Sequence, residues 1–145
     1  MADSSDKTIL SVDYGTKRIG LAKSDSLGII ATAVDTLEVK SASDALRKVR
    51  QVIERIRPAA IVIGYPLLQS GDRSDSCIAI DGFIEKLSTT FKGPIHRVDE
   101  ADTSIEAVGV IRAHGKRVGR DKKRVDRLAA VIILQRFLDE RDAKA

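Results

Sequence analysis

The spacing of apolar residues along the chain predicts five strands and four helices. Short apolar or alternating runs predict strands at residues 8–14, 18–24, 29–37, 59–64 and 95–99. Apolar residues three or four positions apart, with polar residues that can cap the first turn, predict helices at residues 41–57, 75–91, about 102–113 and 124–141. Pro58 and the Gly93-Pro94 pair end the first two helices.

The order of these elements, βββαβαβαα, is typical of an α/β protein. Three leading strands predict an antiparallel meander, and two later strands that follow helices predict parallel additions to the same sheet. We therefore expect a mixed five-stranded sheet flanked by helices. The 145 residues are enough for one domain spanning residues 1–145, with residues 1–7 and 141–145 as flexible ends.

The same spacing predicts which side of two helices is buried. In the first helix the expected apolar face comprises Leu46, Val49, Ile53 and Ile56, with Ser41 or Ser43 as the N-cap. In the last helix the expected face comprises Leu128, Val131, Ile132 and Leu138.

Composition narrows the classes of protein that fit. Aromatic residues make up only 3% of the chain, which argues against base stacking as the main means of binding a ligand. No apolar stretch approaches the roughly 20 residues of a membrane helix, and the polar N-terminus lacks a signal-peptide core. Cys77 is the single cysteine, so no internal disulfide can form. These features lead us to expect a cytoplasmic protein without a membrane partner.

Positive charge is concentrated near the C-terminal part of the chain. The net charge is +4, and eight basic residues lie between Arg112 and Arg127, opposed only by Asp121 and Asp126. Such a segment favours a polyanionic partner, although a solvated loop is the alternative. With two residues of an early turn, the candidate contacts to nucleic acid are Lys17, Arg18, Lys116, Arg117, Arg120, Lys122, Lys123 and Arg124.

Carboxylates are predicted at the ends of three separate elements. Asp13 ends the first strand, Asp99 and Glu100 close the fifth, and Asp126 lies in the first turn of the last helix. Carboxylate oxygens suit Mg²⁺ or Mn²⁺, and a pair of such ions can support phosphodiester hydrolysis. Each acid also has a simpler explanation, since Asp126 could favour a helix N-terminus and the strand-end acids could merely be exposed.

Four segments together resemble the YqgF/RuvX family of bacterial proteins. They are Val-Asp-Tyr-Gly-Thr-Lys-Arg-Ile-Gly-Leu-Ala-Lys-Ser-Asp at 12–25, Ile-Val-Ile-Gly-Tyr-Pro-Leu at 61–67, Val-Asp-Glu at 98–100 and Val-Asp-Arg-Leu-Ala-Ala-Val-Ile-Ile-Leu-Gln at 125–135. The resemblance runs from about residue 8 to 140. It implies an RNase H-like fold and a metal-dependent nuclease of the cytoplasm.

The resemblance also implies which residues act. The acidic triad of the family corresponds to Asp13, Glu100 and Asp126, as catalytic residues and ligands of Mg²⁺ or Mn²⁺, with Asp99 as a further ligand. Two features depart from the family pattern: Ala101 follows Val-Asp-Glu where Arg or Trp is usual, and Tyr65 and Leu68 replace the commoner Leu and Asn. These departures concern the positioning of substrate more than the binding of metal.

Three functions remain open from the sequence. The first is a nuclease that processes the 5′ end of pre-16S ribosomal RNA, or a Holliday junction resolvase acting on branched DNA. The second is a non-catalytic nucleic-acid-binding protein on the same fold. The third, an actin-like ATPase or sugar kinase, is suggested by Asp-Tyr-Gly-Thr but needs two such domains, and this chain has room for one. The oligomeric state, monomer or homodimer, is also open.

The loop at residues 65–74 is expected to border the cleft that holds these acids. Ser70, Asp72, Arg73 and Ser74 could contact substrate there, or the segment could be an ordinary surface loop.

Overall fold

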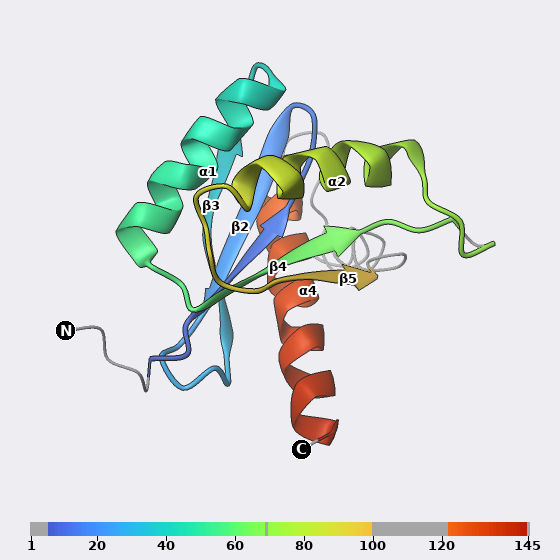
Figure 1. The fold of residues 1–145 in the computed structure, drawn as a ribbon. Coiled ribbons are helices and arrows are strands. Elements are labelled where there is room, and N and C mark those ends of the chain that lie inside the picture. The colour runs from blue at the N-terminus through green and yellow to red at the C-terminus, as the bar shows by residue number, and fades with distance from the viewer. Residues whose placement is uncertain (1–5, 69, 100–121, 145) are drawn as a thin grey trace.

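The fold is built on one mixed sheet, as the sequence predicts. A computed structural model describes residues 6–68, 70–99 and 122–144. Its strands are β1 (Ile9–Asp13), β2 (Arg18–Ser24), β3 (Ala31–Glu38), β4 (Ala60–Tyr65) and β5 (Ile95–Asp99). They lie in the order β3-β2-β1-β4-β5, with β1, β2 and β3 antiparallel and with β4 and β5 parallel to β1 (Figure 1).

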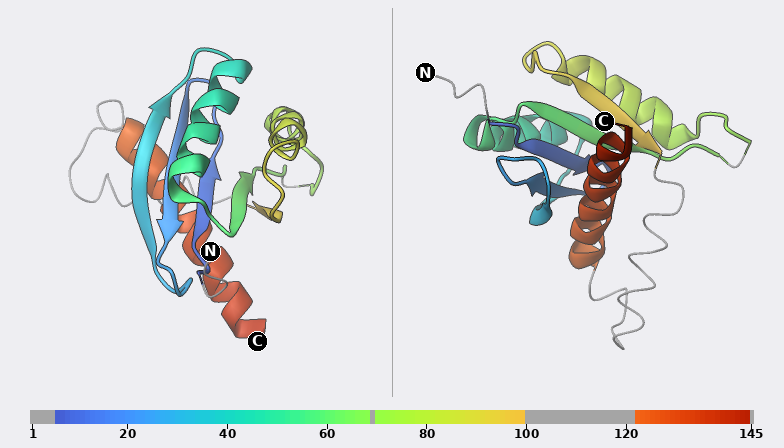
Figure 2. Two further views of the ribbon diagram at one scale, coloured as in Figure 1. Left: turned by 60° about the vertical axis from the view of Figure 1, so that its left-hand side comes forward. Right: turned by 90° about the horizontal axis from the view of Figure 1, so that it is seen from below.

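Helices cover both faces of the sheet. The helices α1 (Ala42–Ile56) and α2 (Asp75–Leu87) lie on one face, and α4 (Lys122–Lys144) crosses the other (Figure 2). The helix predicted at 102–113 and the basic segment that follows it lie outside the described residues. In the part of the chain that the structure describes, no helix is long and apolar enough to span a membrane.

Each face of the sheet has its own hydrophobic core because side chains alternate along a strand. Leu10 and Val12 of β1 point toward α1 and α2, in a core that also includes Ile61, Phe83 and Leu87. The core on the opposite face is made from the alternate strand residues, whose side chains point the other way, together with one side of α4. Its buried members are Ile9, Ala22, Val62, Val98, Ala130, Ile133, Leu134 and Leu138.

The signals that begin and end α1 act as predicted. The Ser41 hydroxyl accepts a hydrogen bond from the Asp44 amide, which identifies Ser41 rather than Ser43 as the N-cap. At the other end Arg57 adopts a left-handed conformation (φ 53°), and its amide donates to the Ile53 carbonyl immediately before Pro58.

Two boundaries differ from the sequence prediction for local reasons. The strand β3 begins two residues later than expected because the Asp25 carboxylate accepts the amides of Ile29 and Ile30 and holds them in a turn. The helix α2 ends at Leu87 instead of residue 91. There the hydroxyls of Ser88 and Thr89 bond to carbonyls of the last turn, a local interaction that competes with a continued helix.

The prediction for the buried side of the last helix is partly wrong. Leu138 is buried, but Leu128, Val131 and Ile132 are only partly buried. The buried side instead comprises Ala129, Ala130, Ile133, Leu134 and Leu138. The two alanines have small side chains, so this face lets the helix approach the sheet closely. The helix also starts earlier and ends later than predicted, and the Arg141 guanidinium, expected in a flexible end, donates to the Gly28 carbonyl.

Candidate functional site

Asp13 is placed on the α4 face of the sheet. It is the last residue of β1, and the strand alternation puts Ile9, Ser11 and Asp13 on one side. The orientation is fixed by contacts of the other two: Ile9 belongs to the core under α4, and the buried Ser11 hydroxyl donates to the Ala130 carbonyl at 2.8 Å. The Asp13 carboxylate therefore points toward α4.

Gly20 brings Asp126 to the same place. Gly20 is the cross-strand neighbour of Asp13 in the antiparallel pair of β1 and β2, so the two positions share a face. A Cβ atom on Gly20 would collide with the backbone carbonyl of Asp126, which shows how closely α4 lies on the strand. Asp13 and Asp126, from opposite ends of the sequence, thus lie on the same face of the sheet on either side of Gly20.

A salt bridge holds the Asp126 carboxylate. Arg18 Nε donates to Asp126 Oδ2 at 2.9 Å, and both side chains are largely shielded from water. Burial raises the pKa of the Asp126 carboxyl above its usual value, and the charges of Arg18 and Arg127 lower it only partly. Arg18, a candidate contact to phosphate from the sequence, is therefore also the partner of an acidic site residue.

The position of Asp126 within α4 removes one simpler explanation. The helix begins at Lys122, two residues earlier than predicted, and no acidic residue lies in its first turn. Asp126 is in the second turn, beyond the range where a helix N-terminus stabilises an acid. Its half-buried carboxylate and the close contact of its backbone to β2 favour a site residue.

The structure does not bring Asp99 to the side of the sheet on which Asp13 lies. Asp99 is aligned with Tyr65 in the parallel pair of β4 and β5, and Tyr65 faces the core beneath α2. The alternation of β5 therefore places Asp99 on the α2 face, opposite to Asp13. Glu100 lies outside the described residues, and within those residues no group of three potential metal ligands occurs. The role of both acids stays a prediction.

The turn after Asp13 is held on both sides. The Tyr14 ring packs on Phe83 of α2, with ring centres 4.6 Å apart, and this contact anchors the end of β1. Gly15 has no positive φ, so a special turn conformation does not explain it. A Cβ atom at Gly15 would lie 2.5 Å from the Arg18 carbonyl oxygen, and this close approach requires glycine.

The predicted basic contacts are only partly described. Lys17 is exposed in the turn between β1 and β2, Arg124 is exposed on α4, and Lys123 Nζ pairs with Glu38 Oε1 at 2.9 Å. Lys122 begins α4. Lys116, Arg117 and Arg120 lie outside the described residues.

A second ionic cluster fixes the start of the loop that follows β4. The Asp81 carboxylate of α2 accepts from the Tyr65 hydroxyl at 2.9 Å and from Arg73 and Arg97 at 3.0 Å each. Tyr65 replaces a residue that is commonly Leu in the resembling family, and its hydroxyl is used for this bond. Arg73, expected at the border of the cleft, is thus tied to α2.

Three contributors to this geometry could not be assigned from the sequence. Gly20 sits inside an apolar strand, where an isolated glycine signals close backbone approach but not the partner. Arg127 donates to the Thr36 hydroxyl at 3.4 Å, across more than ninety residues. Asp81 is one acid among several polar residues on an amphipathic helix, and nothing in its spacing indicates that it binds two arginines.

Solved structures with the same fold include two proteins bound to Holliday junction DNA. RuvC of T. thermophilus in complex with a Holliday junction substrate superposes with a TM-score of 0.60 at 18% identity, covering 96% of this chain and 98% of RuvC. The fowlpox virus resolvase bound to Holliday junction DNA gives 0.57 at 14% identity, covering 92% and 97%. At these identities the likeness shows the fold, which is RNase H-like.

Several proteins are much more similar to this chain in sequence than these solved structures are. A protein of Koribacter versatilis named "Putative pre-16S rRNA nuclease" is 44% identical over 92% of this chain and 87% of its own length. Proteins of the same name from Clavibacter michiganensis and Dictyoglomus turgidum are 40% and 38% identical, each over 90% of this chain and over 81% and 93% of their own lengths. The RuvX family, described as Holliday junction resolvase, matches residues 7–140. Because the family match spans most of the chain and these relatives are 38–44% identical to it, the chain belongs to the RuvX family.

Proposed function

We propose that this protein is a metal-dependent nuclease that hydrolyses phosphodiester bonds in structured nucleic acid, with ribosomal RNA precursor as its substrate. The observation that carries the proposal is the convergence of Asp13 and Asp126 on one face of the sheet, through the contact between Gly20 and α4.

The donor set fits a hard divalent cation. Asp13 and Asp126 supply carboxylate oxygens, which Mg²⁺ and Mn²⁺ prefer. Within the described part of the chain Arg18 engages only Oδ2 of Asp126, which leaves Oδ1 for a further ligand. Burial of Asp126 also favours a cation, because the ion would offset the cost of a desolvated negative charge. Glu100 is proposed as the third ligand from the family resemblance.

The residues of the chain have separable tasks in this reaction. Asp13 and Asp126 would hold the divalent ion, and the ion would supply charge stabilisation at the phosphate and a more acidic water. Arg18 keeps the Asp126 carboxylate oriented and favours its ionised form. Ser11 and Gly20 fix the distance between β1, β2 and α4, so that the two carboxylates stay in register.

The substrate class follows from the close relatives. Three proteins that share 38–44% identity with this chain are named as nucleases of the pre-16S ribosomal RNA. The proposed reaction is therefore processing of the 5′ end of that precursor. Such a substrate places the protein in the cytoplasm.

A resolvase of four-way DNA junctions is the second candidate, because the family as a whole is described by that activity. Symmetric cutting of two strands requires two active sites related by symmetry, and therefore a homodimer. A monomer that cuts precursor RNA would argue against this candidate.

The decisive test gives the purified protein two labelled substrates, a pre-16S RNA fragment and a four-way DNA junction, with Mn²⁺ or Mg²⁺. We expect metal-dependent cutting of the RNA at one position and no paired cuts in the junction. Cutting of the junction alone would replace the substrate that we propose. Salt-sensitive binding of both without any cutting would favour a non-catalytic binding protein on the same fold.

A further inference from the structure

The chain leaves the C-terminal ends of β1 and β4 in opposite directions. After β1 it continues to β2 and β3 on one side, and after β4 it continues through α2 to β5 on the other side. In an open α/β sheet, such a divergence leaves a crevice between the ends of the two strands, where ligands bind. Since Val12 is aligned with Ile63, the next residue, Asp13, ends β1 at this crevice.

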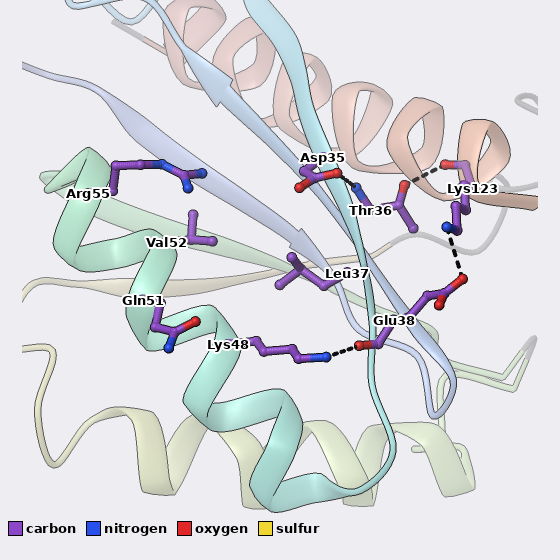
Figure 3. Close-up of a pocket in the computed structure, with 9 residues that line it drawn as sticks. All are labelled: Asp35, Thr36, Leu37, Glu38, Lys48, Gln51, Val52, Arg55 and Lys123. Atoms are coloured by element: carbon purple, nitrogen blue, oxygen red, sulfur yellow. Dashed lines mark hydrogen bonds and ion pairs between the residues drawn. The ribbon is translucent and has the colours of Figure 1, made fainter.

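The charged groove between α1 and β3 is a less suitable place for a substrate, because its charges are paired within the protein (Figure 3). Lys123 pairs with Glu38, and Lys48 bonds to the Glu38 carbonyl and pairs with Asp44. This groove also lies on the α1 side of the sheet, whereas Asp13 points toward α4. The crevice between β1 and β4 is therefore where we expect the substrate.

The loop between β4 and α2 starts at this crevice. The structure describes its residues 66–68 and 70–73, which we call the β4–α2 loop. In Figure 1 it leaves the end of β4 and extends beyond the sheet before α2 begins. The loop has internal hydrogen bonds, from the Leu68 amide to the Asp72 carbonyl at 2.9 Å and from the Gly71 amide to the Leu68 carbonyl at 2.8 Å.

The carboxylate of Asp81, on α2, holds both ends of the β4–α2 loop. Its Oδ2 atom accepts from the Tyr65 hydroxyl at 2.9 Å, just before the loop, and from Arg73 Nη1 at 3.0 Å, at the end of the loop. Its Oδ1 atom accepts from Arg97 Nε of β5 at 3.0 Å. One side chain thus connects β4, β5 and the loop to α2.

The same helix contacts the residue that follows Asp13. Phe83, two positions after Asp81, packs against the ring of Tyr14. The helix α2 therefore joins the β4–α2 loop to the end of β1, and the position of the loop relative to the Asp13 carboxylate depends on Asp81.

The packing of α2 does not depend on this ionic cluster. The buried side chains of the helix are Cys77, Ile80, Phe83, Ile84 and Leu87. The side chains of Arg73 and Arg97 are 62% and 44% exposed, and ion pairs with such exposure contribute little to stability. We therefore expect that loss of the Asp81 carboxylate releases the loop and leaves α2 in place.

We infer that Asp81 is a positioning residue, which fixes the β4–α2 loop as one wall of the crevice beside Asp13 and so holds bound nucleic acid in one register. Asp81 acts through Tyr65 and Arg73 and does not itself contact the substrate. The inference rests on the proposed function, because it concerns how the substrate of that reaction is oriented.

Single-turnover cleavage separates positioning from binding. A labelled pre-16S RNA fragment is cut in Mn²⁺ by increasing concentrations of wild type, Asp81→Asn, Tyr65→Phe and the control Asp44→Asn. Asp44 likewise pairs with two basic residues, Arg47 and Lys48, but on α1 and away from the loop. Melting curves establish that each variant is folded.

We expect Asp81→Asn to lower the maximal rate at least about tenfold and to spread the cuts over neighbouring positions, because a loosely held wall misplaces the substrate. The protein concentration at half-saturation should not rise, since freeing two arginines leaves more positive charge for the RNA. Tyr65→Phe should act in the same direction but less strongly, and the control should cut like wild type. An unchanged maximal rate in Asp81→Asn, or an equal fall in the control, would overturn the inference.

Hydrogen exchange tests the wall without catalysis. In EDTA, the exchange of the Leu68 and Gly71 amides is followed with and without the RNA fragment. We expect RNA to slow this exchange in wild type. In free Asp81→Asn the exchange should be about fivefold faster than in free wild type, the factor for one lost hydrogen bond, and RNA should no longer slow it.

Exchange in wild type that does not respond to RNA would overturn the inference. If wild type cuts nothing, while RNA slows the exchange of the loop in wild type and not in Asp81→Asn, the proposed activity fails and the positioning role of Asp81 stands.

Discussion

At the scale of single residues, Asp126 combines a stability cost with the role in metal binding that we propose for it. Burial raises the pKa of its carboxyl, so the ionised form is less stable in the folded protein than in the unfolded chain. Active sites commonly hold charged groups in this way and give up stability for activity.

We predict that Asp126→Asn abolishes nuclease activity and raises the free energy of unfolding at neutral pH by about 0.5–2 kcal/mol. Because the folded-state pKa is raised, the penalty in wild type is present above that pKa and is relieved as the pH falls through it. The difference in the free energy of unfolding between variant and wild type should therefore shrink as the pH falls through the folded-state pKa of Asp126. Urea unfolding at a series of pH values measures it, and a difference independent of pH would contradict the explanation.

The partner of Asp126 gives a second prediction. Arg18→Gln removes the positive charge that lowers the pKa of the Asp126 carboxyl, so that pKa should rise further. We expect the acidic limb of the pH–rate profile to move to higher pH and the affinity for Mn²⁺ to fall about tenfold. The matched change Arg47→Gln, outside the site, should leave both unchanged. An unshifted acidic limb in Arg18→Gln would show that the salt bridge does not tune this carboxyl.

Asp13 and Asp126 could be proposed as site residues from the sequence because motifs mark them at the ends of predicted elements. Arg18 could be listed among basic residues, but its bond to Asp126 depends on the packing of α4 on β2. Gly20 has no side chain, so its importance appears only where another backbone approaches it.

At the scale of elements, the packing of α4 on β2 decides whether the site forms. The contact requires glycine at position 20 and small residues on the helix, and Ala129 and Ala130 supply them. The sequence prediction favoured the large aliphatic residues of α4, and it therefore assigned the buried face to the wrong side of the helix. Hydrophobic size is a guide to burial, but close approach of a helix to a sheet selects small residues.

We predict that Gly20→Ala destabilises the protein by about 1–3 kcal/mol, the usual cost of overpacking, and abolishes activity by displacing Asp126. Gly82→Ala is the control, since a Cβ there meets nothing within 4 Å and alanine favours the helix. Thermal unfolding and a cleavage assay on both variants test this prediction. Normal activity in Gly20→Ala would mean that α4 tolerates a shift without loss of the site.

The strands were predicted more accurately than the helix faces. Strand type and order follow from short apolar runs and from turns, which are local signals. The end of α2 and the start of β3 depend on single side chains, Ser88 and Asp25, that compete for backbone groups. Such competition is hard to recognise in advance because the same residues also occur inside regular elements.

At the scale of the whole molecule, the topology brings Asp13 and Asp126 to one end of the sheet. The strands β1, β4 and β5 are parallel, so their C-terminal ends lie side by side at one end of the sheet. The antiparallel strand β2 begins at the same end. Ligands of open α/β sheets bind just beyond the C-terminal ends of the parallel strands. The fold class and the position of the site at this end of the sheet could be predicted from the order of elements. The face of the sheet on which Asp99 lies could not, because it depends on how β5 is aligned with β4.

Metal binding should stabilise the whole molecule. An ion that binds only the folded state raises its stability by mass action, so we predict that saturating Mn²⁺ raises the melting temperature of wild type by about 3 °C. The increase should be lost in Asp13→Asn and kept in Asp139→Asn, a change at an exposed acid on α4. An equal increase in all three proteins would indicate binding elsewhere.

The central claim is that Asp13 and Asp126 form one metal-dependent cutting site. The most direct measurement is cleavage of a labelled pre-16S RNA fragment in Mn²⁺ by wild type, Asp13→Asn, Asp126→Asn and the control Asp139→Asn. We predict that each of the two site variants cuts at least about 100-fold more slowly while remaining folded, and that the control cuts like wild type. Undiminished cleavage by either site variant would contradict the claim.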